Sequence, residues 1–157
     1  MPNPAAGPDL SARYDNGKLQ VWLALLRTAR GVETDLRVRC RQQLHTTLPR
    51  FDVMAALYRS TDGLGMSALT SQLLIANGNA TSIVERLAAD GLVERTTPTD
   101  DRRAVVVRLT TKGRTVFADM ATAHDRWIDE ILAPLAEQDV RAILSLLTKV
   151  HAPMTSS

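Results

Sequence analysis

Polar side chains that can hydrogen-bond to nucleic-acid bases are spaced along a short helical pattern in the middle of the chain. Asn79, Ser82 and Arg86 follow one another at offsets of three and seven residues, so they share one helix face. Asn can bind adenine through two hydrogen bonds, Arg can bind guanine, and Ser can hold a base edge or a phosphate. This face therefore predicts contact with the major groove of DNA. The plainer interpretation is a solvated polar face.

The same helical pattern has an apolar side that fixes which residues are left for binding. Its inward positions are Ala80, Ile83, Val84 and Leu87, which recur at helical spacing. Asn77 and Thr81 then lie outside this apolar side or at its rim, and we include both among the candidate DNA contacts. Glu85 stands next to Arg86, and we expect it to pair with an arginine rather than to touch DNA.

A second charged group lies in a turn between two β-branched runs. Val93–Thr97 and Ala104–Leu109 predict two strands of a hairpin, and the turn between them contains Asp101, Arg102 and Arg103. A narrow minor groove attracts guanidinium groups, so these arginines are candidates for a minor-groove contact. The alternative is a solvated hairpin tip whose charges pair with one another. Arg95, Arg102 and Lys112 are further candidates for phosphate contacts.

The elements that must hold these groups follow from apolar periodicity and from helix start and stop signals. Pro49 suits the first turn of a helix whose inner face begins at Phe51, Gly91 suits a helix stop, and Thr110 suits an N-cap. The segment between 60 and 65 is expected to be a loop. The expected helices are 18–44, one from Pro49, 67–74, one ending near Asp90, 110–131 and 137–150. The order helix, turn, helix, hairpin predicts a mainly α fold with a small β-hairpin, a winged helix-turn-helix.

Composition limits the other possibilities. The chain has 157 residues, enough for one domain with a substantial core, and no apolar run long enough to predict a membrane span. A single cysteine, Cys40, excludes an internal disulfide and fits a reducing cytoplasm. The three histidines are scattered, and no nucleophile elbow or phosphate-binding glycine loop is present. We therefore expect no enzyme activity, no metal and no cofactor.

The end helices carry apolar stripes that a small central domain does not cover. Leu19, Trp22 and Leu26 form part of one stripe, and Ile143 and Leu147 form part of the other. A two-fold homodimer built from the N- and C-terminal helices is the simplest arrangement that buries them. Residues 1–16 are expected to be a disordered leader and residues 152–157 a disordered tail.

Two features of the first long helix leave alternatives open. Arg27, Arg30, Arg37 and Arg41 form a basic stripe, which is either a solvated face paired with Glu33 and Asp35 or a site for an anionic ligand. Cys40 lies on the apolar stripe, where a thiol is usually inert, although a redox role is the alternative.

Several of these segments together resemble the MarR (multiple antibiotic resistance regulator) family. The resemblance rests on Phe51–Leu57, on Asn77–Val84, on Gly91–Arg95, on Asp101–Arg103 and on Val107–Gly113, in this order and at matching spacing. The Asn-Gly-Asn-x-Thr opening at Asn77 is most similar to a subgroup tied to aromatic-acid catabolism, some of whose members respond to hydroxycinnamoyl-CoA thioesters. Ser82 departs from the family pattern, which often has Arg there.

The resemblance implies a homodimeric, cytoplasmic regulator that binds double-stranded DNA. It implies one domain over 17–151, with a winged helix-turn-helix at 49–110 and dimerisation helices at 17–45 and 111–151. It places Arg103 in the minor groove, with Asp101 holding the wing. It also implies a small-molecule pocket beside the dimerisation helices, for which the candidates are Trp22, Arg30, Arg37 and Phe51.

From this resemblance we expect a repressor that a small aromatic compound or its CoA thioester releases from a pseudo-palindromic operator. Two alternatives stay open. One is an oxidant sensor acting through Cys40, since one branch of the family senses peroxide with a cysteine. The other is a winged-helix interaction module without specific DNA binding.

Overall fold

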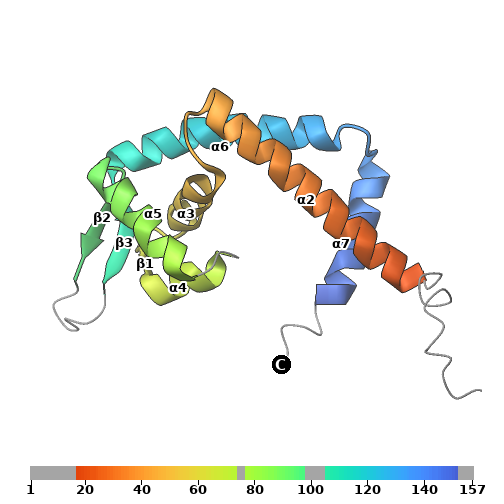
Figure 1. The fold of residues 1–157 in the computed structure, drawn as a ribbon, viewed down its shortest axis with the longest axis horizontal. Coiled ribbons are helices and arrows are strands. Elements are labelled where there is room, and N and C mark those ends of the chain that lie inside the picture. The colour runs from red at the N-terminus through yellow and green to blue at the C-terminus, as the bar shows by residue number, and fades with distance from the viewer. Residues whose placement is uncertain (1–16, 74–76, 98–104, 152–157) are drawn as a thin grey trace, which may run out of the picture. The chain divides into compact units, whose positions relative to one another are not determined.

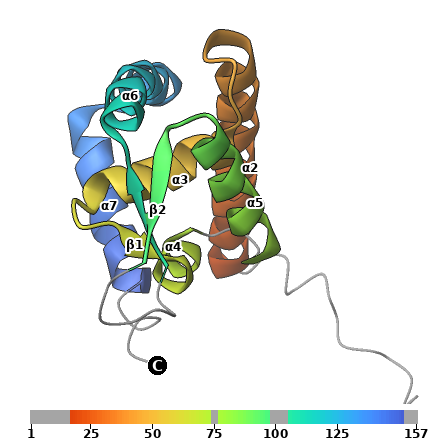
Figure 2. The same ribbon diagram turned by 90° about the vertical axis from the view of Figure 1, so that its left-hand side faces the viewer.

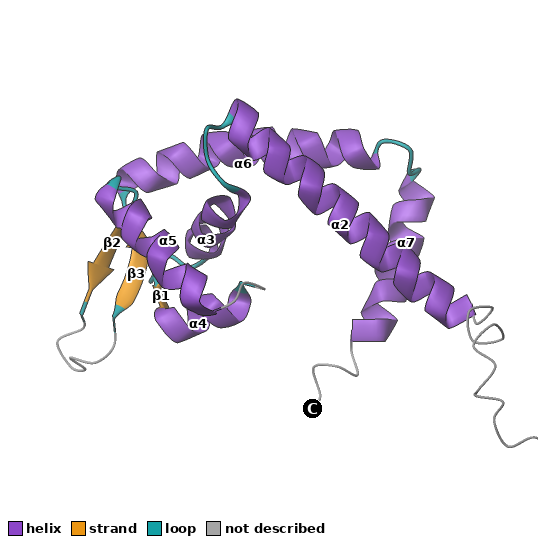
Figure 3. Cartoon of the chain, in the orientation of Figure 1, coloured by secondary structure: helices purple, strands orange, loops and turns teal. Residues whose placement is uncertain are grey.

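The computed structural model describes residues 17–73, 77–97 and 105–151, and these residues are mostly helical, with one small sheet (Figures 1 and 3). They divide into two compact units, residues 1–48 and 49–157, which are described separately. The predicted leader and tail lie outside the described residues. No helix in the described part of the chain is long and apolar enough to cross a membrane.

The first unit contains the long helix α2, Gly17–Gln43, as the apolar periodicity predicts. Leu36 and Cys40 are buried, whereas the more N-terminal Trp22 is 57% exposed. The arginine stripe is in part the solvated, ion-paired face that was one of its two interpretations, because Arg37 pairs with Glu33 at 2.5 Å. Asp35 pairs with Arg39, at 2.6 Å, rather than with an arginine of the stripe.

The second unit begins with the helices that form its core. These are α3, Leu48–Arg59, then α4, Met66–Gln72, and α5, Asn77–Ala89. The inner face that begins at Phe51 is buried, and it consists of Phe51, Val53, Met54 and Leu57. α4 ends two residues before the predicted helix end at Leu74, because Leu73 adopts an extended conformation.

The sheet has three strands, not the two that the sequence predicts. Strand β1, Leu64–Gly65, pairs antiparallel with β3, Val106–Leu109, which pairs on its other edge with β2, Val93–Thr96. The segment expected to be a loop between residues 60 and 65 therefore contributes the third strand. Gly63 allows this arrangement, because its φ is +84° and an added Cβ would lie 2.7 Å from the carbonyl oxygen of Val107.

The two strands predicted for the hairpin pair antiparallel with each other (Figure 2). Their register pairs Val93 with Leu109 and Thr96 with Val106, so Val93, Val107 and Leu109 are buried on one side of the sheet. Two further helices follow, α6, Thr111–Leu132, and α7, Glu137–His151. The predicted cap of α6 is confirmed, since the Thr110 hydroxyl accepts a 3.0 Å hydrogen bond from the Gly113 N–H.

Candidate nucleic-acid interface

Helix α5 presents the polar face that the sequence predicts. Its inward residues, Ala80, Ile83, Val84 and Leu87, are buried. The other side carries exposed Asn79, Thr81 and Arg86, with Ser82 half-buried beside them. Asn77 is the first residue of the helix. An exposed row of amide, hydroxyl and guanidinium groups on a helix buried on its other side can hydrogen-bond to an external ligand without disturbing the core.

The ion pair expected of Glu85 is present. Its carboxylate lies 3.9 Å from the guanidinium of Arg95, which comes from β2. Half-exposed pairs of this kind contribute little to stability. The contact places Arg95 at the border between α5 and the hairpin.

The carboxyl end of α5 stops at a glycine, as predicted. Gly91 has a φ of +70°, its N–H donates to the Ala88 carbonyl, and the Leu92 N–H donates to the Leu87 carbonyl at 2.9 Å. These two hydrogen bonds are those of a Schellman motif, which satisfies the last carbonyls of a helix. The chain leaves this motif directly into β2, so the sequence of the turn fixes α5 relative to the hairpin.

Three contacts from distant segments converge on the same turn. Arg50, near the start of α3, donates to the Asp90 carboxylate at 2.5 Å. Lys112 of α6 donates to the Asp90 carbonyl at 2.9 Å, and the Thr110 hydroxyl donates to the Gly91 carbonyl at 2.8 Å. The hydrogen bond and charge of Arg50 hold the pKa of Asp90 below its ordinary value. Sequence reasoning missed Arg50 and Asp90, and it offered Lys112 only as a phosphate contact.

Glycine at position 113 is required by the approach of α6 to this turn. A Cβ there would lie 1.9 Å from the Leu92 carbonyl oxygen, far inside contact distance. The Thr110 N–H also donates to that oxygen, at 3.1 Å. The start of α6, the end of α5 and the start of β2 therefore form one hydrogen-bonded junction.

The remaining predicted site residues are placed as follows. Asp101, Arg102 and Arg103 at the hairpin tip lie outside the described residues. Arg108, which was not among the predicted site residues, is exposed on β3 and is paired in register with Glu94. Among the described residues, no group of three or more His, Cys, Asp or Glu side chains is arranged to hold a metal ion.

The candidates for an effector site are divided between the two units. Trp22, Arg30 and Arg37 lie on α2 in the first unit, and all three are exposed. Phe51 is buried in the second unit, where its ring lies 5.4 Å from that of Phe117 and stacks on His124 at 4.5 Å. It therefore packs as a core residue of α3.

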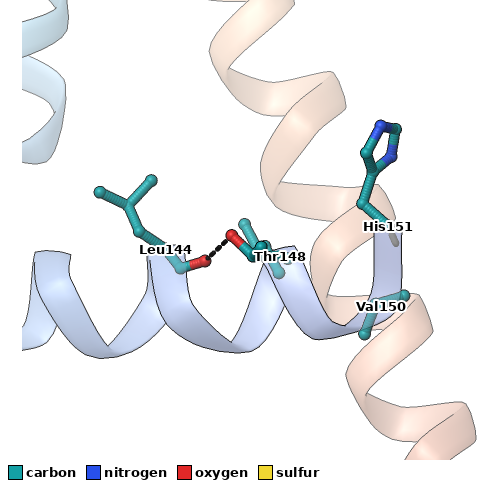
Figure 4. A pocket seen from close by; sticks show the side chains of 5 residues that line it. Leu144, Thr148, Val150 and His151 are labelled. Atoms are coloured by element: carbon teal, nitrogen blue, oxygen red, sulfur yellow. Dashed lines mark hydrogen bonds between the residues drawn. The ribbon is translucent and has the colours of Figure 1, made fainter. Parts of the chain in front are cut away.

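An apolar depression lies on α7 instead (Figure 4). It is lined by Leu144, Leu147, Thr148, Val150 and His151, and the Thr148 hydroxyl is used within the helix, donating to the Leu144 carbonyl at 2.8 Å. No residue of α7 is buried, and Leu144 is 60% exposed. Figure 4 shows Leu144 and His151 extending from the helix. The depression is part of a longer apolar face rather than a polar ligand site.

A two-helix motif followed by an antiparallel hairpin, with an exposed polar face on the second helix, defines a winged helix-turn-helix protein. The family model described as "MarR family" matches residues 46–105. The crystal structure of a MarR family transcriptional regulator from Silicibacter pomeroyi is 32% identical to this chain, covers 90% of it and 97% of that protein, and superposes with a TM-score of 0.76. The chain belongs to the MarR family of transcriptional regulators.

Two further comparisons extend this result. The HTH-type transcriptional regulator BilQ of Clostridium symbiosum is 30% identical over 88 residues, which cover 56% of this chain and 61% of BilQ, less than two thirds of its length. A crystal structure of an E. coli MarR variant complexed with operator DNA has a TM-score of 0.74 at 23% identity, and covers 86% of this chain and 96% of that one. At 23% identity, the similarity to the E. coli MarR variant shows a shared fold and nothing more.

Proposed function

We propose that this chain is a repressor that binds a pseudo-palindromic DNA operator as a homodimer in the cytoplasm. The observation that carries the proposal is the exposed polar face of α5, backed by a buried face and fixed at its carboxyl end. Recognition helices of this motif enter the major groove, and dimers bind half-sites about 10 bp apart, one helical turn. The E. coli MarR variant with the same fold was crystallised on operator DNA, which supports this use of the fold.

Exposed apolar side chains support the homodimer. α7 carries a face at heptad-like spacing, with Val140, Ile143, Leu147 and Val150 all exposed. In the first unit, Val21, Trp22 and Leu25 of α2 are exposed as well. Apolar surface of this extent is typical of a subunit interface, and a two-fold pair would present two recognition helices to the two half-sites.

The proposed effector is a small aromatic acid or its CoA thioester that favours a dimer unable to span both half-sites. Trp127 on α6 supports an acidic or carbonyl-bearing ligand, because its indole N–H is buried without an acceptor among the described residues. A buried unsatisfied donor costs about 1–3 kcal/mol, which an added acceptor would recover. Cys40 is buried, and buried thiols are usually inert. This favours the small-molecule effector over oxidant sensing.

The test is fluorescence anisotropy of the full chain on the intergenic DNA beside its own gene, with random DNA of equal length at two salt concentrations. We expect operator affinity well above that for random DNA, falling steeply with salt because phosphate contacts release counterions. Arg86→Ala should weaken operator binding by about 1–3 kcal/mol. Arg126→Ala, which removes an exposed arginine from α6, is the matched control and should bind as the wild type does.

Equal affinity for operator and random DNA would contradict the proposal and favour the interaction module. Aromatic acids and their CoA thioesters are then added to the bound complex. If one compound releases the wild-type protein from DNA but not Arg30→Ala, Arg37→Ala or Trp127→Phe, the substituted residue contacts that compound. Release by mild peroxide that a Cys40→Ser variant resists would favour the oxidant sensor instead.

A further inference from the structure

The carboxyl end of α5 is held to α3 by the side chain of Asp90, which is not one of the residues proposed to contact DNA. Asp90 follows the last residue of α5, and its partner Arg50 is 40 positions earlier in the chain, in the first turn of α3. Arg50 is only 22% exposed, whereas Asp90 is 52% exposed. The pair therefore joins the partly buried first turn of α3 to the exposed turn that ends α5.

A small change of angle at the carboxyl end of α5 produces a larger displacement at its amino end. A helix of 13 residues is roughly 20 Å long, so a rotation of about 5° at its carboxyl end moves its amino end by nearly 2 Å. Hydrogen bonds to base edges tolerate only a few tenths of an ångström around 2.9 Å. Asn79 and Thr81, near the amino end, are the groups that such a movement would displace most.

We propose that Arg50 and Asp90 are a positioning pair that determines operator specificity without touching DNA, by fixing the angle of α5 against α3. The inference rests on the proposed function, because it assumes that α5 reads the operator. The backbone contacts of Lys112 and Thr110 hold the position of the turn, and the side-chain pair adds the constraint on angle. The lowered pKa of Asp90 agrees with a pair that stays ionised at neutral pH.

The alternative is a surface ion pair with a small effect on stability and none on recognition, which is common for exposed pairs. A double-mutant cycle distinguishes the positioning pair from the simple surface ion pair. The variants are Asp90→Asn, Arg50→Gln and both together, and the quantity is the ratio of operator affinity to random-DNA affinity at fixed salt. Matched controls remove the same charges elsewhere, at Asp129 with Asp129→Asn and at Arg59 with Arg59→Gln, both exposed.

We expect each single variant to lower that ratio by about three- to tenfold, and the double variant to lower it by less than the two single effects combined, because both changes break the Arg50–Asp90 interaction. The controls should leave the ratio unchanged. A ratio unaffected by the single variants, or losses that add in the double variant, would overturn the proposal. Arg50→Lys, which keeps the charge, serves if Arg50→Gln does not fold.

A measurement without DNA separates this inference from the proposed function. Hydrogen exchange of the free protein should be faster at the Ala88 and Ala89 amides in Asp90→Asn, and unchanged in the middle of α6. Unchanged exchange in α5 would also overturn the positioning role. If the wild type shows no operator preference while exchange in α5 rises, the proposed function fails and the positioning of α5 by the pair stands.

Discussion

His124 shows how burial gives one side chain a pH-dependent effect. Its ring stacks on Phe51 with an interplanar angle of 18°, so the half-buried imidazole packs against a core ring. Burial lowers its pKa below 6.5, because desolvation disfavours the charged form, and Asp125, 4.0 Å away, only partly offsets this. In the unfolded chain the pKa returns to about 6.5, so acid favours unfolding.

We therefore expect the folded state to lose stability as the pH falls below about 6.5, until the pH reaches the lowered pKa of His124. Above 6.5 the imidazole is neutral in both states and contributes no pH dependence. His124→Phe keeps an aromatic ring beside Phe51 but cannot be protonated, so its melting temperature should change less between pH 7.5 and 5.5. His151→Phe changes an exposed histidine and is the control. Equal pH dependence in wild type and His124→Phe would rule out this role.

At the scale of elements, the junction of α5, β2 and α6 holds α5, the helix proposed to bind DNA, and the hairpin together. Two kinds of interaction form it, hydrogen bonds to the Asp90, Gly91 and Leu92 carbonyls and the close approach of Gly113 to Leu92. Any side chain at position 113 would force α6 away from that carbonyl. The junction therefore depends on a glycine for space, not for a left-handed backbone.

Gly113→Ala should accordingly destabilise the protein by about 3 kcal/mol or more, since the methyl group would overlap a backbone atom that cannot move independently. Urea unfolding followed by circular dichroism measures this. Gly31→Ala in α2 is the matched control, because no atom lies within 4 Å of its added methyl group. That control should be neutral or stabilise by up to about 1 kcal/mol, as alanine is the better helix former. Similar losses in both variants would contradict the steric explanation.

The sequence predicted the helices and the hairpin because their signals are local. Apolar residues at helical spacing, Gly91 at a helix stop and Thr110 at a cap each act within a few positions. β1 was missed because a two-residue strand has no alternation to detect, and its partner, Val107, is more than 40 positions away. The Arg50–Asp90 pair was missed for the same reason. The polar face of α5 was predictable, and the contacts that orient it were not.

At the scale of the whole molecule, the exposed apolar face of α7 is the feature that a monomer does not explain. Leu144 and Leu147 line its depression, and no residue of α7 is buried in the single chain. The helix is nevertheless well capped, since the Asp139 carboxylate accepts from the Ala136 N–H at 2.9 Å and Glu137 pairs with Arg141. A stable helix with an uncovered apolar face fits a partner helix.

Leu147→Glu should therefore convert the proposed dimer to monomer, because a charge on this face would have to be buried against apolar groups. Sedimentation equilibrium gives the mass, and operator affinity should fall with the loss of the second half-site. Ser145→Glu adds the same charge on α7 at a position away from the apolar residues, and it should remain dimeric. A wild-type chain that is monomeric at micromolar concentration would refute the prediction.

The central place of β3 in the sheet also sets an order of events during synthesis. β1 and β2 both precede β3 in the chain and pair with its two edges, so neither has a partner before Val106, and β2 is fully paired only when Leu109 has been made. Protein synthesis adds about 5–20 residues per second, so roughly one to four seconds pass between the addition of Ala89, the last residue of α5, and the completion of β3. While the chain grows on the ribosome, α5 can therefore pack against α4, which precedes it, but it has no sheet beside it until β3 has been made.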